Sequence, residues 1–266
     1  MFYEDLSTVD VLGPIEGECQ TGKMALELGE DGNLCVKLKF LADVNYPWVH
    51  SVISSDRKCI RWLGIYWKYY HLIPRGCQGC WKTVVKPRNL GELMKVHKIQ
   101  KELGITSKVG MEQRPYGTGH WGAYWYAPIT GGLQGGRKVF GQVKEAMKPL
   151  GLKPILKRAC TEMEYGAGSS DKWIYGPEHR ILEDLLDKFF VGEPMDLTKN
   201  PANLQVHVMK RWVEWAYRND DQTVWQFAER ASFPKKYVRY DDSIHTPRDF
   251  PVIFEPEVKL EELPDE

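Results

Sequence analysis

Residues 81–165 carry strand and helix patterns in the order β-α-β-β-α-β, and this order constrains the fold more than any other feature of the chain. It is typical of the split βαβ, or ferredoxin-like, arrangement. Right-handed crossovers would place both helices on one face of the sheet and leave the other face free. The predicted strands cover 81–86, 107–114, 121–127 and 154–165, and the predicted helices cover 89–103 and 137–150. Asn89 and Gly104 stand at the N-cap position and just past the C-terminal end of the first helix.

The flanking segments predict further elements. Alternating apolar and polar residues at 24–28 and 34–40, separated by a turn at 30–33, indicate a β-hairpin. The aromatic stretch 59–71 fits either a helix or a strand. Helical periodicity returns at 177–190, 203–217 and 220–231, and the acidic segment 255–266 is typical of a solvated arm.

The fold class that follows is α+β: a ferredoxin-like central domain with an N-terminal β-hairpin and a C-terminal helical extension. We expect domain boundaries near residues 75 and 166. The predicted domains are 1–75 (hairpin and aromatic segment), 76–166 (basic ferredoxin-like domain) and 167–266 (helices and acidic tail).

Charge is strongly segregated along the chain, although the whole is neutral with 36 basic and 36 acidic side chains. Residues 56–160 hold 20 Lys and Arg against 5 Asp and Glu, and both flanks are acidic. A basic block of this kind attracts polyanions, of which nucleic acid is the commonest large one. The alternative is that the acidic flanks neutralise the block within the fold.

The predicted strand at 121–127 combines with this charge to suggest a nucleic-acid interface. Alternation places Trp121 and Trp125 on one face, and Tyr124 and Tyr126 on the other. Exposed rings can stack on bases, whereas rings covered by helices only build the core. The predicted nucleic-acid-binding residues are Lys82, Lys86, Arg88, Lys108, Arg114, Trp121, Tyr124, Trp125 and Tyr126. An acidic protein surface is the other partner that these residues suit.

Cys77-Gln78-Gly79-Cys80 is the sharpest local motif, because two thiolates with this spacing can chelate one tetrahedral metal. The pair precedes a strand, which argues against a thioredoxin-like redox role. Cys59 and Cys160 are the candidates for the remaining ligands. We expect the fourth strand, with Cys160, to lie beside the second strand, and the first beside the third. The hypothesis is a structural zinc ion, with an iron–sulfur cluster as the alternative and buried unliganded thiols as the simplest outcome.

Clustered carboxylates give an alternative function, a metal-dependent nuclease that uses Glu112, Glu162, Glu164 and Asp171. A third interpretation is a viral or cellular assembly protein whose acidic tail docks on the basic block of a neighbour. Catalytic residues are otherwise not indicated.

The sequence also points to a location. The first 22 residues lack an apolar leader core, and no apolar stretch reaches the ~20 residues that a membrane span needs. Six Cys without a secretory signal favour reduced thiols and a cytoplasmic protein, and no membrane partner is expected. The leading interpretation is an intracellular nucleic-acid- or polyanion-binding protein with a Cys-ligated structural metal; the sequence does not indicate an oligomeric state.

Overall fold

The structure is a computed structural model that describes residues 47–52, 58–189 and 202–229, with Gly13, Glu16 and the backbone of residues 24–28 and 34–38. The chain divides into two units, 1–227 and 228–266. The second unit is described only at Ala228 and Glu229, so the predicted acidic arm lies outside the described residues. The predicted domain boundaries near residues 75 and 166 stay predictions.

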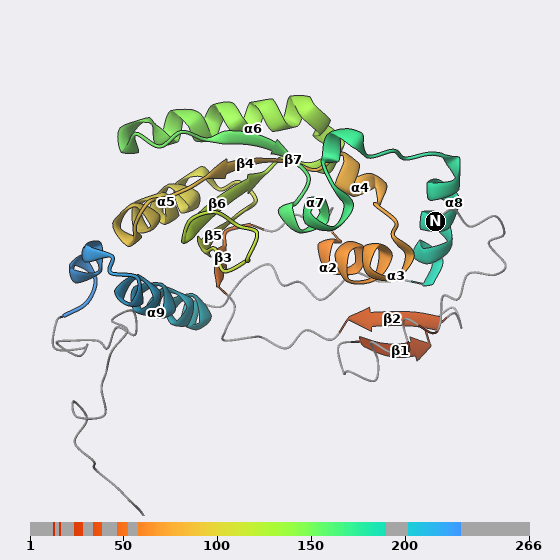
Figure 1. Ribbon diagram of the computed structural model, residues 1–266, viewed down its shortest axis with the longest axis horizontal. Coiled ribbons are helices and arrows are strands. Elements are labelled where there is room, and N and C mark those ends of the chain that lie inside the picture. The colour runs from red at the N-terminus through yellow and green to blue at the C-terminus, as the bar shows by residue number, and fades with distance from the viewer. Residues whose placement is uncertain are drawn as a thin grey trace, which may run out of the picture. The chain divides into compact units, whose positions relative to one another are not determined.

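The first unit is an α+β fold built around an antiparallel sheet, which has five strands among the described residues (Figure 1). The strand order is β3-β5-β6-β4-β7, and each neighbouring pair runs antiparallel. The strands are β3 (Trp48–His50), β4 (Trp81–Val85), β5 (Ser107–Met111), β6 (Trp121–Tyr126) and β7 (Ile155–Arg158).

One prediction about this sheet is wrong. The fourth strand of the central pattern, β7, pairs with the first, β4, and not with the second, β5. The reason is that β6 already lies between β4 and β5, so the chain returns to the free edge of β4. This placement brings the residues after β7 close to the Cys77–Cys80 turn, because that turn leads directly into β4.

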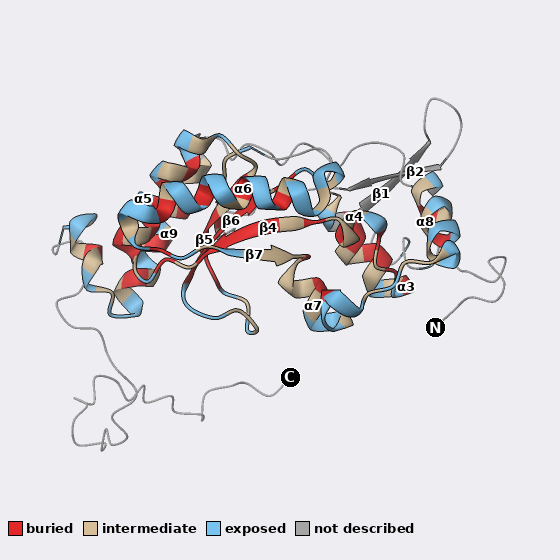
Figure 2. Cartoon of the chain, turned by 90° about the horizontal axis from the view of Figure 1, so that it is seen from above, coloured by how far each residue is buried: buried red, intermediate tan, exposed pale blue. Residues whose placement is uncertain are grey.

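Three helices cover one face of the sheet, namely α5 (Leu90–Leu103), α6 (Gly132–Met147) and α9 (Ala202–Arg218). The predicted ends of α5 are confirmed: the Asn89 side chain accepts a hydrogen bond from the Glu92 amide, and Gly104 adopts a φ of 60°. Figure 2 shows the buried residues of these helices turned toward the buried strands. Burial of this apolar face supplies the main stabilisation of the fold.

The main core lies between the sheet and these helices. Trp125 of β6 and Trp212 of α9 are fully buried in it, and the Trp212 indole Nε1 donates to the Pro47 carbonyl at 3.0 Å. The ring of His97 meets the Trp212 ring edge-on, with centroids 5.8 Å apart. These contacts attach α9 to β3 and α5.

Short helices build a second, smaller core beside the sheet. The aromatic stretch 59–71 is helical, with Tyr66 fully buried in this core. The elements concerned are α2 (Cys59–Arg61), η2 (Trp62–Trp67), α3 (Lys68–Tyr70), α4 (Arg75–Gln78), α7 (Thr161–Ala167) and α8 (Pro177–Phe189).

The remaining described elements are short. The predicted N-terminal hairpin is confirmed in the backbone, where the two strands pair antiparallel with Leu26 opposite Val36. The hairpin strands are β1 (Met24–Leu28) and β2 (Leu34–Leu38). Short 3-10 segments elsewhere in the chain are η3 (Ile129–Gly131), η4 (Lys148–Leu150), η5 (Ser170–Lys172) and η6 (Gln222–Gln226). No described helix is long and apolar enough to cross a membrane.

Two predicted elements are wrong in type or extent. The strand expected at 154–165 ends at Arg158, because Ala159 adopts a φ of 58° and the chain turns into α7. Cys160 then serves as the N-cap of α7, with its Sγ accepting from the Met163 amide at 3.3 Å. The helix expected at 220–231 is only the short 3-10 segment η6 within the part of the chain that is described.

Candidate functional site

The face of the sheet opposite α5, α6 and α9, termed the open face below, carries most of the predicted binding residues. Its central side chains Trp48, Val84 and Tyr124 are nevertheless buried and form a small cluster of their own. The register pairs Lys82 with Tyr126 and Lys108 with Tyr124, so these four side chains share one face. Trp48 joins them from β3, where its ring meets the Tyr124 ring edge-on at 5.5 Å. Alternation along the strand predicted that Tyr124 and Tyr126 share a face, but it did not predict which face the helices cover or that Trp48 joins them.

Lys82 and Lys108 form a close cationic pair on the open face. Their Nζ atoms each lie 5.4 Å from the centroid of the Tyr124 ring, and Lys108 Nζ also lies 4.4 Å from the Trp48 ring. Lys82 is only 2% exposed. Neither ammonium group has a hydrogen-bond or ion-pair partner among the described residues. Burial lowers the pKa of Lys108 to about 8, against the opposing effect of Glu162.

Arg114 and Glu112 form a buried ion pair next to these lysines. Arg114 Nε donates to Glu112 Oε1 at 2.6 Å, and the Tyr124 hydroxyl donates to Glu112 Oε2 at 2.7 Å. Burial alone would raise the pKa of Glu112, but the hydrogen bonds from Arg114 and Tyr124 outweigh it and lower the pKa to about 2. Arg114 is thus already engaged by carboxylates, whereas the two lysines are not.

The predicted carboxylate site is not assembled as expected. Glu162 and Glu164 lie on α7 and not on a strand, and each pairs with a cation: Glu162 with Arg114 at 2.6 Å, and Glu164 with Lys157. Asp171 lies in η5 and is exposed. No group of three or more His, Cys, Asp or Glu side chains among the described residues is arranged to hold a metal ion.

The prediction that Trp121 and Trp125 stack on bases is not borne out. Trp125 is fully buried and Trp121 is 2% exposed, both in the core under the helices. They face away from the open face because they alternate with Tyr124 along β6. Neither ring can offer a face to a base, and Tyr124, which is 3% exposed, cannot do so either, so this part of the predicted site is wrong.

Two further predicted contacts lie at the edge of the open face or outside it. Lys86 follows β4 and donates from Nζ to the Thr118 carbonyl at 2.6 Å and to the Thr118 hydroxyl at 2.7 Å. Arg88 precedes α5, is 70% exposed and pairs with Glu92 one turn later. These two cations therefore have partners within the chain.

An aromatic pair that the sequence did not predict lies at the margin of the open face. Tyr116, in the loop between β5 and β6, stacks on Tyr165 of α7 with ring centroids 4.6 Å apart and planes 21° apart. Tyr165 is 73% exposed, which is unusual for so large a ring. No local pattern links two residues 49 positions apart, and the error of assigning 154–165 to a strand hid the pairing.

The four candidate metal-binding cysteines come from three segments of the chain. Cys77 lies within α4, Cys80 precedes β4, Cys160 caps α7 and Cys59 begins α2. The Ala159 amide donates to the Cys80 carbonyl at 2.7 Å, which joins the segment of Cys77 and Cys80 to that of Cys160. Burial raises the pKa of the Cys77 thiol, and the thiols of Cys59, Cys160 and Cys80 raise it further, so all four are electrostatic neighbours.

The turn that holds Cys77 and Cys80 is fixed from two sides. Arg158 donates from Nε to the Gln78 carbonyl at 2.9 Å and from Nη2 to the Gln78 side chain at 2.6 Å. On the other side the Trp62 ring packs against Gly76, where an added Cβ would come within 2.1 Å of the ring. The turn is therefore rigidly placed between β7 and the helix that begins at Cys59.

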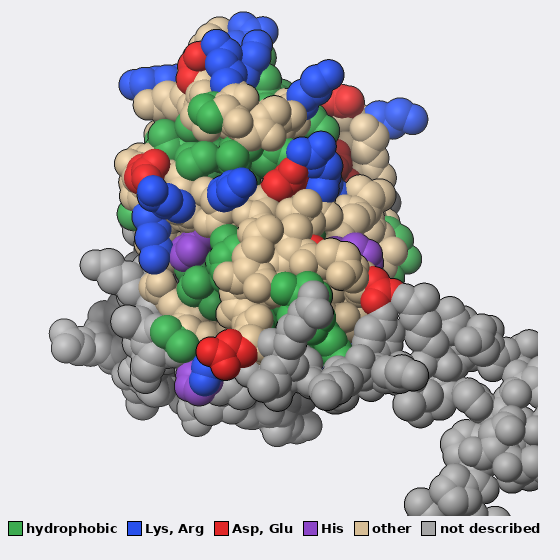
Figure 3. Space-filling view, turned by 90° about the vertical axis from the view of Figure 1, so that its left-hand side faces the viewer, with side chains coloured by type: hydrophobic (Ala, Val, Ile, Leu, Met, Phe, Trp, Pro, Cys, Tyr) green, Lys and Arg blue, Asp and Glu red, His purple; other side chains and the backbone are tan. Residues whose placement is uncertain are grey.

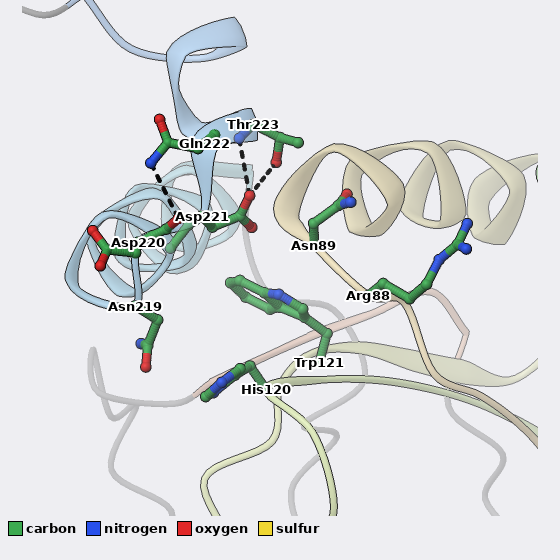
Figure 4. A pocket seen from close by; sticks show the side chains of 10 residues that line it. Arg88, Asn89, His120, Trp121, Asn219, Asp220, Asp221, Gln222 and Thr223 are labelled. Carbon is green, nitrogen blue, oxygen red and sulfur yellow. Dashed lines mark hydrogen bonds between the residues drawn. The ribbon is translucent and has the colours of Figure 1, made fainter.

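A pocket lies on the helix side of the sheet, at the start of α5 (Figure 4). Its walls include His120 and residues of the segment that ends in η6. The amides that a helix N-terminus offers to an anion are already bonded here, since Leu90 N donates to Asp221 Oδ2 at 2.5 Å and Gly91 N donates to Thr223 Oγ1 at 2.9 Å. The Asp221 carboxylate thus occupies the position at the N-terminus of α5 where an external anion would bind.

The helix layer provides a second gathering of cations. Figure 3 shows Lys and Arg side chains spread over the upper part of one side of the molecule, with fewer acids between them. The exposed cations of α5 and α6 are Lys95, Lys98, Lys101, Arg137, Lys138 and Lys144. This surface is a competitor to the open face for any polyanion.

Comparison with known proteins does not decide between these surfaces. No protein-family model, curated protein or solved structure matches the chain. The functional assignment therefore depends on the geometry of the site alone.

Proposed function

We propose that the protein binds nucleic acid through the open face, with Lys82 and Lys108 as the phosphate-binding pair. The observation that carries the proposal is the absence of any partner for these two ammonium groups among the described residues, although Lys82 is 98% removed from solvent. Beside them, one cation, Arg114, pairs with two carboxylates, Glu112 and Glu162, so this cluster offsets one of the two lysine charges. The pair is thus a local surplus of positive charge.

The two buried ammonium groups carry an energetic cost that a bound phosphate would offset. Burying an ammonium group without a counter-ion costs several kcal/mol, and two such groups near one ring repel each other. The lowered pKa of Lys108 is the expected sign of that cost. A phosphate group between the two lysines offsets the cost, because charge-assisted hydrogen bonds to phosphate are among the strongest that proteins form.

The proposed frame for this site is ferredoxin-like. From the β7 edge, the four central strands follow the order fourth, first, third, second, and α5 and α6 are the two crossovers. The two crossover helices lie on one face of the sheet, and nucleic-acid-binding modules with a comparable four-stranded sheet bind RNA on the opposite face. Such an analogy supports the location of the site and carries no further detail.

The proposal includes a structural zinc ion held by Cys59, Cys77, Cys80 and Cys160, with an iron–sulfur cluster as the alternative. The thiols are neighbours, and an ion would have to draw them closer than they stand. Its part would be to join α2 and α7 to the start of β4. Elemental analysis of the purified protein tests this: one equivalent of zinc or iron is expected, lost in Cys77→Ser and Cys80→Ser and kept in Cys19→Ser. No bound metal in the wild type would end this part of the proposal.

Nuclease activity finds less support, because Glu112, Glu162 and Glu164 all pair with cations and none is directed at a common empty position. The assembly role depends on the tail at 255–266, outside the described residues, and stays a prediction. Neither alternative is proposed.

Fluorescence anisotropy with a labelled oligonucleotide of roughly 20 nucleotides tests binding directly. We expect an affinity that falls steeply between about 50 and 200 mM salt. The double variant Lys82→Met/Lys108→Met should lose at least ~10-fold in affinity and about two units of the salt slope, since each phosphate contact contributes about one. The matched control, Lys95→Met/Lys101→Met, removes the same charge from α5.

Three results would overturn the proposal. One is an absence of binding to single-stranded DNA, single-stranded RNA and duplex alike. Another is equal affinity for the wild type and the Lys82/Lys108 variant, with both folded by circular dichroism. The third is a larger loss in the control variant, which would assign binding to the helix surface.

A further inference from the structure

Tyr165 has one ring face on Tyr116 and is nevertheless 73% exposed, so its outer face is open to solvent. Tyr165 lies on α7, whose Met163 is buried in the second core and whose Glu162 and Glu164 are held by Arg114 and Lys157. These anchors fix the helix that carries the ring. Tyr165 is thus an exposed aromatic ring on a rigid support.

The Arg114 side chain connects the stacked pair, Tyr116 and Tyr165, to the site formed by Lys82 and Lys108. The Arg114 guanidinium lies 5.9 Å from the centroid of the Tyr116 ring and 5.6 Å from that of the Tyr124 ring. Lys82 and Lys108 lie on the other side of this chain of contacts, each 5.4 Å from the Tyr124 centroid. Aromatic and cationic groups therefore follow one another across the open face from Tyr165 to the lysines.

This sequence of groups matches the chemistry of a single-stranded nucleotide chain. Each base offers a flat face that stacks on an aromatic ring, and each phosphate attracts a cation. Bases within a duplex already stack on their neighbours, so their faces are not available to a protein ring. A second tyrosine beneath the first keeps the outer ring flat and in place, which lowers the entropy lost on stacking.

We propose that the outer face of Tyr165 stacks on an unpaired base of single-stranded nucleic acid whose phosphate is bound at Lys82 and Lys108. This inference depends on the proposed function and adds the class of ligand and a base-binding residue that lies outside the lysine pair. Arg114 is a positioning residue in this arrangement, because it holds Tyr116 and α7 through its ring contact and its ion pair with Glu162.

The test compares Tyr165→Ala, Tyr165→Phe and the control Phe227→Ala, which removes another exposed ring, at the end of η6. Anisotropy is measured with single-stranded DNA, with an abasic backbone of equal length and with duplex. We expect Tyr165→Ala to weaken single-strand binding by roughly 5- to 100-fold, the range measured for loss of one stacked base. Tyr165→Phe and Phe227→Ala should bind like the wild type.

The abasic backbone separates stacking from charge. It should bind the wild type and Tyr165→Ala equally, and the salt slope should be the same for both proteins. A 2-aminopurine placed along the strand should lose fluorescence on binding to the wild type and keep it with Tyr165→Ala. An equal loss with the abasic backbone, or preference for duplex, would overturn the inference.

Failure of this inference differs from failure of the proposed function. If Tyr165→Ala binds like the wild type while Lys82→Met/Lys108→Met does not, the lysine site stands and the stacking site falls. If the wild type binds no oligonucleotide, both proposals fall together.

Discussion

Lys82 on β4 and Lys108 on β5 are separated by the whole of β6, yet their Nζ atoms both lie 5.4 Å from the centre of the Tyr124 ring on that middle strand. The ring is thus flanked by two ammonium groups that form no ion pair with a carboxylate among the described residues, although Glu162 is near enough to raise the pKa of Lys108. Aromatic rings attract cations weakly compared with a true counter-ion. This relationship is the reason that the open face, and not the helix surface, is the proposed interface.

The first prediction concerns pH. Burial, with Arg114 and Lys82, lowers the pKa of Lys108 to about 8 against the opposing effect of Glu162 and Cys59. Anion binding should therefore weaken as the pH rises through about 8, when Lys108 loses its charge. Affinities measured between pH 6.5 and 9.5 at constant salt check this. Lys108→Arg stays charged and should bind equally across the range; a parallel decline in that variant would contradict the assignment to Lys108.

The same pKa has an opposite effect on folding. Between about 8 and the ordinary value of 10.5, the unfolded chain binds more protons at Lys108 than the folded chain. The stability contributed by this residue therefore increases with pH across that window. Binding and stability should change in opposite directions as the pH rises, which distinguishes titration of Lys108 from general unfolding.

The second prediction concerns Glu112→Gln. Its side chain is 1% exposed and bonded to Arg114 and Tyr124, so the neutral amide leaves the partly buried Arg114 guanidinium with Glu162 as its one carboxylate among the described residues. We expect a loss of about 3 kcal/mol in unfolding free energy, measured by urea denaturation. Glu102→Gln on α5, 4.0 Å from Lys98 and 60% exposed, should change stability by less than about 0.5 kcal/mol.

Acid titration gives this prediction a second measurement. The pKa of Glu112 is lowered from 4.5 to about 2, so its contribution to stability is complete above pH 4.5 and is lost as the pH falls toward 2. The wild type should lose stability in that window by more than Glu112→Gln does. Identical acid profiles for the two proteins would show that the ion pair does not form.

The third prediction concerns Gly110→Ala on β5. An added Cβ would lie 2.0 Å from the Pro47 carbonyl oxygen and 3.0 Å from the Trp48 Cα, both backbone atoms. Steric overlap should separate β3 from β5 and cost at least about 1–3 kcal/mol. Hydrogen exchange should rise at Trp48 to His50. Gly141→Ala, exposed on α6 with nothing near its added Cβ, should instead stabilise the protein by about 0.5–1 kcal/mol.

The fourth prediction concerns Trp212→Phe. The ring still fills the core position, but the 3.0 Å hydrogen bond to the Pro47 carbonyl is lost. That carbonyl keeps the bond it accepts from the Met111 amide, so no buried acceptor is left unpaired. The expected cost is about 1 kcal/mol. A loss above ~3 kcal/mol would mean that ring volume, and not the hydrogen bond, governs the site.

Local signals predicted some elements well, because their causes lie within a few residues. Helix α5 begins after Asn89 and ends before Gly104 as expected, because a side-chain cap and a left-handed glycine act over one turn. At Glu162-Met163-Glu164 the local pattern gave the wrong prediction. Their alternation fits a strand, but the turn at Ala159 and the cap at Cys160 produce a helix with Met163 as its buried residue.

The sequence alone determined the α+β class, the order of the central elements, the alternation that separates Tyr124 from Trp121 and Trp125, and the candidate thiols, because periodicity, caps and alternation are properties of neighbouring residues. Only the tertiary structure decided that Trp121 and Trp125 lie in the core, that Arg114 is neutralised while the two lysines are not, and that Tyr116 meets Tyr165. These outcomes depend on which segments pack together over long separations, and a partner far along the chain leaves no mark on the local pattern.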